Sequence, residues 1–232
     1  MRMRGLIDST LREGAQTPGV MFSSEQKIAI AKAVALVGIE EIELGIATTL
    51  DPDLERLIAE LRVMENCPRL ALWSRCRTED IIYAGHLRPD VLSLSLPASE
   101  RHIATRLGKS RDWVLTRLKE SVALAQELGI ANVSLGVEDS SRAESGFLGE
   151  LIDTAVALGV RRIRLADTVG VLTPMATAAA ITQLRQLHPE VELGFHGHND
   201  FGMASANAVA ALEAGAQWAD VTVMGLGERA GC

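Results

Sequence analysis

Cysteine, histidine and aromatic side chains are all scarce in this chain of 232 residues, and these shortages limit the classes of protein to which it can belong. The three cysteines, Cys67, Cys76 and Cys232, form no CxxC pair and are odd in number, which favours reduced thiols over a disulfide scaffold. Aromatic residues make up 3%, and no sticky patch for a membrane or a nucleic acid stands out. The net charge of −7 also argues against nucleic-acid binding, although a few local arginines can hold small anions.

Long apolar runs are absent as well. None follows the basic start at Met1–Arg4, so we expect no signal peptide, no transmembrane span and, by default, a cytoplasmic location. The hydrophobic fraction of 47% excludes a disordered chain. The length suits one α/β domain with a large core, and no linker or low-complexity tract divides it, so we expect residues 1–232 to form a single domain.

Short β-like runs alternate with longer helical patterns along the chain. Repeated β-then-α units predict a parallel sheet, and eight strands favour a closed (β/α)8 TIM barrel over an open sheet. The expected strands are Leu6–Asp8, Glu41–Leu44, Leu70–Ser74, Val91–Leu96, Asn132–Val137, Arg162–Ala166, Glu192–His196 and Asp220–Met224. The expected helices are Ser24–Val37, Pro52–Met64, Thr78–Ala84, Arg111–Leu128, Gly146–Leu158, Pro174–Leu187 and Ala204–Ala214.

The sequence given ends at Cys232, just after the eighth expected strand. A complete barrel has an eighth helix covering that strand. We therefore expect a C-terminally truncated barrel without its last helix, and apolar surface left bare beside the last strand.

Two of the five histidines lie in the stretch Phe195–Asp200. In an extended strand His196 and His198 point to the same face, where two neutral imidazoles make half of a divalent-metal site. The alternative is two polar residues that face solvent at a strand end. Polar and charged residues follow nearly every expected strand, where a TIM barrel places its chemistry, and this favours a metal-dependent enzyme. Candidates for a third ligand are Asp8, Glu13, Asp139, Asp167 and Asp200.

Two histidines and one carboxylate leave positions free for water or a bidentate ligand, and suit Mn, Fe, Zn or, with more water, Mg. A 2-oxo acid can chelate such an ion through its carboxylate and carbonyl oxygens, and the ion then polarises the carbonyl. Arg12 could stabilise charge on the same oxygen, or form an ordinary salt bridge. The glycine-rich block Gly225–Gly231 has the wrong spacing for dinucleotide binding.

Three blocks resemble the signatures of the isopropylmalate and homocitrate synthases, in the DRE-TIM metallolyase superfamily. They are Leu11–Gln16 with Lys27 further on, Phe195–Gly202, and Gly225–Gly231. The resemblance covers essentially the whole chain. Other blocks are most similar to the nitrogenase-associated homocitrate synthases: Ser93–Pro97, Leu107–Arg111, Glu138–Arg142 and Leu165–Val171.

This resemblance implies a Claisen condensation of acetyl-CoA with a 2-oxo acid, most simply 2-oxoglutarate giving homocitrate, in amino-acid biosynthesis or nitrogen fixation. It implies that Glu13, His196 and His198 bind a divalent metal (Mg, Mn or Zn), and that Arg12 stabilises the oxo group. Glu138 would assist enolisation together with a residue from beyond the barrel. Gln16, Glu43 and Thr168 would lie around the substrate.

The family pattern also implies a homodimer and a C-terminal lid region with a catalytic His or Tyr, which we expect to be missing here. Three positions depart from the pattern. Ala15 replaces an acidic residue, Ser134 replaces an arginine that grips the oxo acid in lysine-pathway enzymes, and Cys232 replaces an asparagine near the metal. These departures concern the choice of substrate and the outer contacts of the metal.

Three alternatives stay open. The chain could be a 2-isopropylmalate or citramalate synthase, which differ in the pocket for the oxo-acid side chain. It could be a lyase or aldolase of the same superfamily, such as hydroxymethylglutaryl-CoA lyase or 4-hydroxy-2-oxovalerate aldolase. It could also be an inactive remnant that binds a ligand or partner without turnover.

Overall fold

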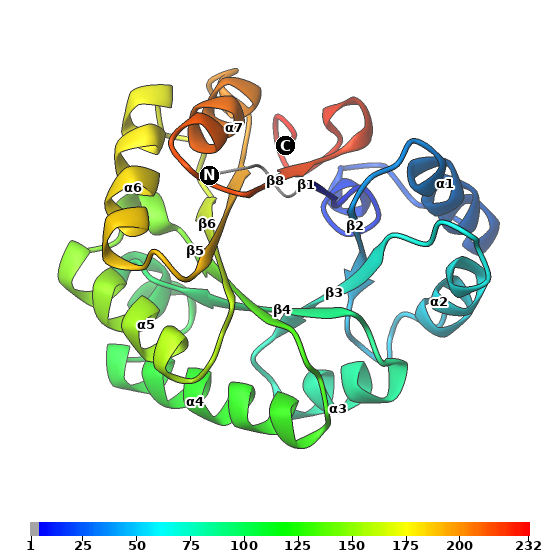
Figure 1. The fold of residues 1–232 in the computed structure, drawn as a ribbon, viewed down its shortest axis with the longest axis horizontal. Coiled ribbons are helices and arrows are strands. Elements are labelled where there is room, and N and C mark those ends of the chain that lie inside the picture. Colours follow the sequence, from blue (N-terminus) through cyan, green and yellow to red (C-terminus); the bar gives the residue numbers. More distant parts are fainter. Residues whose placement is uncertain (1–4) are drawn as a thin grey trace.

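Eight parallel strands close into a barrel in a computed structural model that describes residues 5–232 (Figure 1). The basic start at Met1–Arg4 lies outside the described residues. Each strand pairs with the next in sequence, and β8 pairs with β1 to close the ring. The strands are β1 (Gly5–Asp8), β2 (Glu41–Ile46), β3 (Arg69–Arg75), β4 (Val91–Pro97), β5 (Val133–Glu138), β6 (Arg162–Asp167), β7 (Glu192–Gly197) and β8 (Trp218–Val221).

An outer ring of helices surrounds the strands (Figure 1). The helices are α1 (Ser24–Leu36), α2 (Leu54–Arg62), α3 (Thr78–Leu87), α4 (Arg111–Glu127), α5 (Ser145–Ala157), α6 (Pro174–Leu187) and α7 (Ala204–Glu213). The layer between strands and helices holds buried aliphatic side chains such as Leu72, Leu94, Leu135 and Ile163, which form one core cluster. The predicted (β/α)8 barrel is thus confirmed. Among residues 5–232, no helix is long and apolar enough to cross a membrane.

The prediction for the last strand was wrong in its position. We expected Asp220–Met224, but β8 runs over Trp218–Val221, and a 3₁₀ turn follows at Val223–Gly225. The Val223 amide donates to Thr10 Oγ1 instead of to a strand, and Met224 has a left-handed backbone with φ of 57°. These two features end the strand pairing. No α-helix follows β8 within the described residues.

A short π-helix, Arg101–Arg106, lies between β4 and α4 and was not predicted. π-Helices are rare and often occur at functional sites. Its buried residue, Ile103, belongs to the core, while its last residue, Arg106, reaches the mouth of the barrel. The π-helix therefore brings a cation from the β4–α4 connection to the carboxyl ends of the strands.

Candidate metal centre and cavity

Glu13, His196 and His198 form a buried cluster at the carboxyl ends of β1 and β7. One potential ligand atom from each of the three residues lies within 4.8 Å of the others. The two Nε2 atoms of the histidines are 3.3 Å apart, and His196 Nε2 lies 3.8 Å from Glu13 Oε2. Metal–nitrogen bonds of ~2.0–2.1 Å allow one ion to contact both rings. Of the five candidate carboxylates, Glu13 is the one that the structure places beside both histidines.

The surroundings of the cluster fit a divalent cation. His198 Nδ1 is buried and has no hydrogen-bond partner among the described residues, although Glu13 Oε1 lies 4.0 Å away. His196 Nδ1 lies 2.8 Å from Asp220 Oδ2, so that ring can donate its Nδ1 proton and leave the Nε2 lone pair for an ion. Glu13, His196 and His198 would hold the ion, which would supply Lewis-acid polarisation of a bound carbonyl.

The two histidines have opposite affinities for protons. Burial disfavours the His196 cation, but the neighbouring Cys232 and Asp220 groups outweigh this effect and raise the pKa of His196 to about 10. Burial and the neighbouring His196 charge lower the pKa of His198 to about 4. At neutral pH the His196 ring is therefore a cation with both nitrogens protonated, whereas the His198 ring is neutral and faces it as an acceptor. Removing one proton from His196 leaves two neutral imidazoles for an ion.

Below the cluster, buried groups of alternating charge form a closed ring. Arg12 donates from Nη1 to Glu13 at 2.5 Å and from Nε to Glu43 at 2.6 Å. Arg164 donates to the other oxygen of Glu43 at 3.0 Å and to Asp220 at 2.9 Å. Asp220 in turn contacts His196, and His196 lies beside Glu13, which closes the ring. Burial would raise the pKa of Glu43, but Arg12 and Arg164 hold it down at about 2.

This ring fixes the geometry of the site. Its members come from five segments: β2, β6, β7 and β8 contribute one charged group each, and the segment after β1 contributes two. Burying isolated charges is costly, and each one here is offset by two neighbours of opposite sign. Burial alone would lower the pKa of Arg12, but the carboxylates of Glu43 and Glu13 raise it. Arg12 stays a cation and cannot turn away from Glu13 without leaving a buried charge unpaired.

The block Gly225–Gly231 packs against Glu13. The Glu228 amide donates to Glu13 Oε1 at 3.0 Å, and a Cβ on Gly227 would lie 3.3 Å from Glu13. A small residue at 227 lets the backbone approach the carboxylate. Cys232, at the end of this block, has its Sγ 3.8 Å from His196 Nδ1, whereas Asp220 is the nearer partner of that ring.

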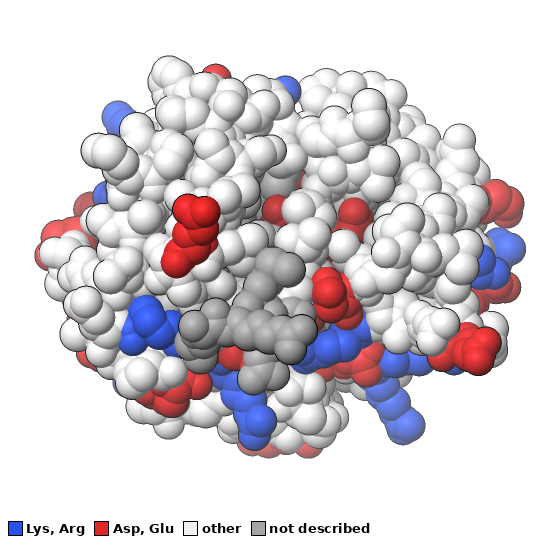
Figure 2. Space-filling view, turned by 45° about the horizontal axis from the view of Figure 1, so that its top comes forward, with Lys and Arg blue, Asp and Glu red and all other residues white. Residues whose placement is uncertain are grey.

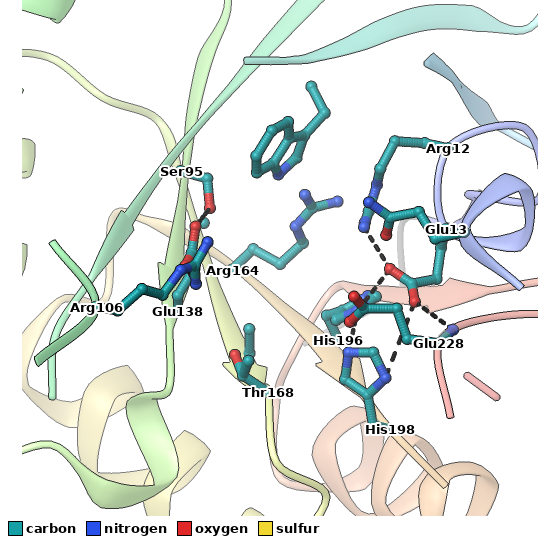
Figure 3. A pocket seen from close by; sticks show the side chains of 14 residues that line it. Arg12, Glu13, Ser95, Arg106, Glu138, Arg164, Thr168, His196, His198 and Glu228 are labelled. Carbon is teal, nitrogen blue, oxygen red and sulfur yellow. Dashed lines mark hydrogen bonds and ion pairs between the residues drawn. The ribbon is translucent and has the colours of Figure 1, made fainter. Parts of the chain in front are cut away.

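A cavity of about 150 Å³ opens beside the cluster (Figure 3). It is lined by seven of the eight residues proposed from the sequence: Arg12, Glu13, Gln16, Glu138, Thr168, His196 and His198. Glu43, which we expected around the substrate, does not line it and is instead fully buried between Arg12 and Arg164. The lining residues not anticipated from the sequence are Trp73, Ser95, Arg106, Gly136, Arg164, Ala166 and Glu228.

Glu138 lies across the cavity from the cluster (Figure 3). Ser95 Oγ donates to its Oε1 at 2.8 Å, and Arg106 Nη1 donates to its Oε2 at 3.0 Å. Thr168 accepts from the Asp139 amide at 2.8 Å, which ties the end of β5 to the loop after β6. The cavity thus has an acidic group on one wall and the histidine–carboxylate cluster on the other.

The other candidate ligands are engaged elsewhere. Asp8 accepts from Thr10, Asp139 pairs with Arg142 and Ser99, Asp167 accepts from two amides of the following loop, and Asp200 pairs with Arg229.

Two positions that depart from the family pattern lie away from the cluster. Ser134 lies near the start of β5 and lines a different cavity with Arg161 and Arg162. Ala15 is exposed and lines a third cavity beside Lys27. Neither Ser134 nor Ala15 lines the cavity beside the cluster.

The chain is thus a TIM barrel with a candidate metal site, a buried cluster of two histidines and one carboxylate, at the carboxyl ends of its strands. The family model described as HMGL-like matches residues 4–232, and the chain belongs to that family.

Curated relatives agree with this assignment. The chain is 39% identical over 226 residues to the homocitrate synthase subunit alpha of Clostridium pasteurianum, covering 97% of this chain and 83% of that protein. It is 38% identical to 2-isopropylmalate synthase 2 of Caldanaerobacter subterraneus subsp. tengcongensis, covering 97% of this chain and 58% of the relative. The chain thus spans little more than half of some relatives that it matches.

Solved structures show the same fold. A hydroxymethylglutaryl-CoA (HMG-CoA) lyase from Bacillus subtilis superposes with a TM-score of 0.85 at 20% identity, covering 98% of this chain and 79% of the lyase. At that identity the likeness concerns the barrel alone.

Proposed function

We propose that residues 1–232 act as one catalytic domain that condenses acetyl-CoA with a 2-oxo acid, with 2-oxoglutarate as the acceptor and homocitrate as the product. The observation that carries this proposal is the pairing, across one small cavity, of the Glu13–His196–His198 cluster with Glu138. A 2-oxo acid needs a site that polarises its carbonyl, and the acetyl group needs a base. The names of the curated relatives, homocitrate and 2-isopropylmalate synthases, support the same reaction class.

The residues of the chain have separate tasks. Glu138 takes a proton from the acetyl methyl group, and the resulting enolate carbon bonds to the oxo carbon of the acceptor. Arg12 donates from Nε to Glu43 and from Nη1 to Glu13, so its Nη2 hydrogens stay available for the acceptor's oxo oxygen, which gains negative charge. That oxygen then takes up the proton that Glu138 removed, which restores the base. Water finally cleaves the thioester, which releases CoA as a thiol and the product as a free acid.

A divalent ion bound by Glu13, His196 and His198 would polarise the acceptor carbonyl. Arg12 faces the same position, so charge on that oxygen would meet a fixed cation whose orientation the buried ring maintains. Gln16 and Thr168 line the cavity and can hydrogen-bond the acceptor.

Thiol release from acetyl-CoA tests this proposal. Purified protein with Mn²⁺ or Mg²⁺ is given 2-oxoglutarate, 2-oxoisovalerate, pyruvate or oxaloacetate in parallel. We expect release with 2-oxoglutarate, lost in His196→Ala and lowered about 10²- to 10⁴-fold in Glu138→Gln. His86→Ala, on the exposed side of α3, is the matched control and should retain the activity.

Other results point elsewhere. Release with a different oxo acid would keep the reaction and change the substrate. Cleavage of HMG-CoA without any condensation would favour a lyase. Metal binding with no release and no cleavage would favour a chain that binds without turnover.

A further inference from the structure

Three arginines line the cavity within the described part of the chain, and two of them already have buried carboxylate partners. Arg12 is buried and donates to Glu13 and Glu43. Arg164 is buried and donates to Glu43, Asp220 and Ser93. Drawing either guanidinium toward a ligand would leave buried carboxylates without their partner, which is costly. Neither is therefore available for a second anionic group on a substrate.

Arg106 is the third cation, and its situation differs. Its side chain is 59% exposed, and its ion pair with Glu138 is its one charged partner among residues 5–232. It stands at the end of the π-helix Arg101–Arg106, at the rim where the cavity meets a neighbouring groove lined by Trp73, Leu96 and Trp113. An exposed, flexible cation can turn toward an incoming anion at little cost.

Apart from Glu138, which is its ion-pair partner, two strand positions on this side of the cavity are small and uncharged. Ser95 on β4 and Gly136 on β5 face the same cavity, and Ser134, further down β5, does not reach it. The wall opposite the Glu13–His196–His198 cluster therefore leaves space for a substrate side chain, and it carries one mobile cation, Arg106 (Figure 3). That combination suits a side chain ending in a carboxylate better than an aliphatic one, which needs an apolar pocket.

We propose that Arg106 binds the distal carboxylate of a dicarboxylic 2-oxo acid and in doing so leaves Glu138. This inference rests on the proposed function, since it assigns the acceptor class of the same site. With no ligand bound, Arg106 occupies Oε2 of the carboxylate that must accept a proton. A substrate carboxylate offers Arg106 a second partner of the same charge. Glu138 then keeps Ser95 on Oε1 and has Oε2 free.

The consequence is a coupling between recognition and base release. A monocarboxylic oxo acid has nothing to draw Arg106 away, so Glu138 stays ion-paired and such an acceptor binds and reacts poorly. Arg106 is on this view a specificity-determining residue that touches the substrate.

Binding measured without turnover tests the proposal. Mn²⁺-loaded protein is titrated calorimetrically, without acetyl-CoA, with 2-oxoglutarate and with 2-oxovalerate, which has the same carbon chain but lacks the distal carboxylate. We expect the wild type to bind 2-oxoglutarate at least about tenfold more tightly. Arg106→Gln should abolish most of this preference, and Arg106→Lys should restore part of it. Arg101→Gln, exposed on the same π-helix, is the matched control and should keep the preference.

The outcomes separate this inference from the proposed function. Equal binding of the two acids by the wild type, or an unchanged preference in Arg106→Gln, would overturn the role of Arg106. A preference for 2-oxoglutarate that Arg106→Gln removes supports it, even where no thiol is released. In that last case the synthase proposal fails while the assignment of Arg106 stands.

Discussion

The proton on His196 is the residue-scale feature with the clearest consequence. The pKa of His196 is raised to about 10, so the ring is charged at pH 7 when no metal is bound, with its Nε2 proton facing His198. The pKa of His198 is lowered to about 4, and that of Glu13 is lowered as well, so neither of them adds a proton near neutrality. An ion that binds Nε2 of His196 must therefore displace one proton.

Metal affinity should consequently rise with pH. We expect the dissociation constant for Mn²⁺ to fall about tenfold per pH unit between pH 6 and 9, because one proton is displaced, and to level off above about pH 10. Calorimetry in buffers of different ionisation enthalpy should show about one proton released per ion at pH 7. An affinity that does not change over this range, with no proton released, would contradict this assignment.

Asp220 is predicted to set the strength of the metal site without touching the ion. It accepts from His196 Nδ1 and fixes which nitrogen of that ring faces the cavity. Asp220→Asn should weaken Mn²⁺ binding by about 10- to 100-fold, as loss of an outer-shell partner does. It should also flatten the pH dependence, because one cause of the raised His196 pKa is gone.

Calorimetric titration of Asp220→Asn, with thermal unfolding as a check on folding, measures this effect. Asp153→Asn, on the exposed side of α5, is the control and should bind as the wild type does. Wild-type affinity in Asp220→Asn would mean that the ring is held without this carboxylate.

The sequence predicted some of these residues and missed others for physical reasons. His196 and His198 lie two apart on a strand, a local spacing that a sequence displays. Glu13 was one of five carboxylates and was singled out only through the family resemblance. Arg164 and Asp220 have no local signal, because the partners of each lie at distant positions in the chain.

At the scale of elements, the alternation of short apolar runs and longer helical patterns predicted seven strands to within one or two residues of their observed bounds. The predicted bounds of β8 were wrong because the strand's end depends on Thr10, more than 200 residues away, which accepts a hydrogen bond from the Val223 amide. The π-helix Arg101–Arg106 was not predicted because its sequence shows no apolar periodicity that distinguishes it from a loop.

A buried ion pair joins two strands at the amino end of the barrel, the end opposite the Glu13–His196–His198 cluster. Arg162 on β6 donates from both terminal nitrogens to Glu41 on β2, at 2.9 and 2.8 Å, and lies 4.4 Å from the centre of the Trp218 ring. Both charged side chains are almost fully buried. This pair links non-adjacent strands and helps to hold the barrel closed.

Arg162→Met should therefore destabilise the fold without affecting the site. Leaving Glu41 buried without this partner should cost about 3–5 kcal/mol of unfolding free energy and lower Tm by roughly 10 °C. Urea unfolding and calorimetric Mn²⁺ titration measure the two effects. The neighbouring, exposed Arg161→Met should change stability by less than about 0.5 kcal/mol. The double variant Glu41→Gln/Arg162→Met should recover part of the loss, and a single variant as stable as wild type would contradict the assigned role.

At the scale of the whole molecule, charge is unevenly distributed. In Figure 2, which turns the α7–β8–α1 side of the barrel forward, the upper part has few charged side chains, and Lys, Arg, Asp and Glu gather in the lower part. The same side holds a groove of about 310 Å³ over β8 and β1, lined by Leu6, Ala208, Val209, Leu212 and Val221. α7 lines one side of this groove, and no α-helix follows β8 within residues 5–232 to cover the rest of it. Val209 is 55% exposed there.

The purified polypeptide of residues 1–232 should therefore associate with itself through this groove. Apolar side chains that meet water over a continuous surface gain free energy when a second copy covers them, by about 25 cal/mol per Å² removed from water. Sedimentation velocity over a range of micromolar concentrations should show a species heavier than the monomer. Val209→Lys should shift it toward the monomer, whereas Val171→Lys, a similarly exposed valine outside the groove, should not. A monomer at every concentration would mean that this groove is too small or too well hydrated to drive association.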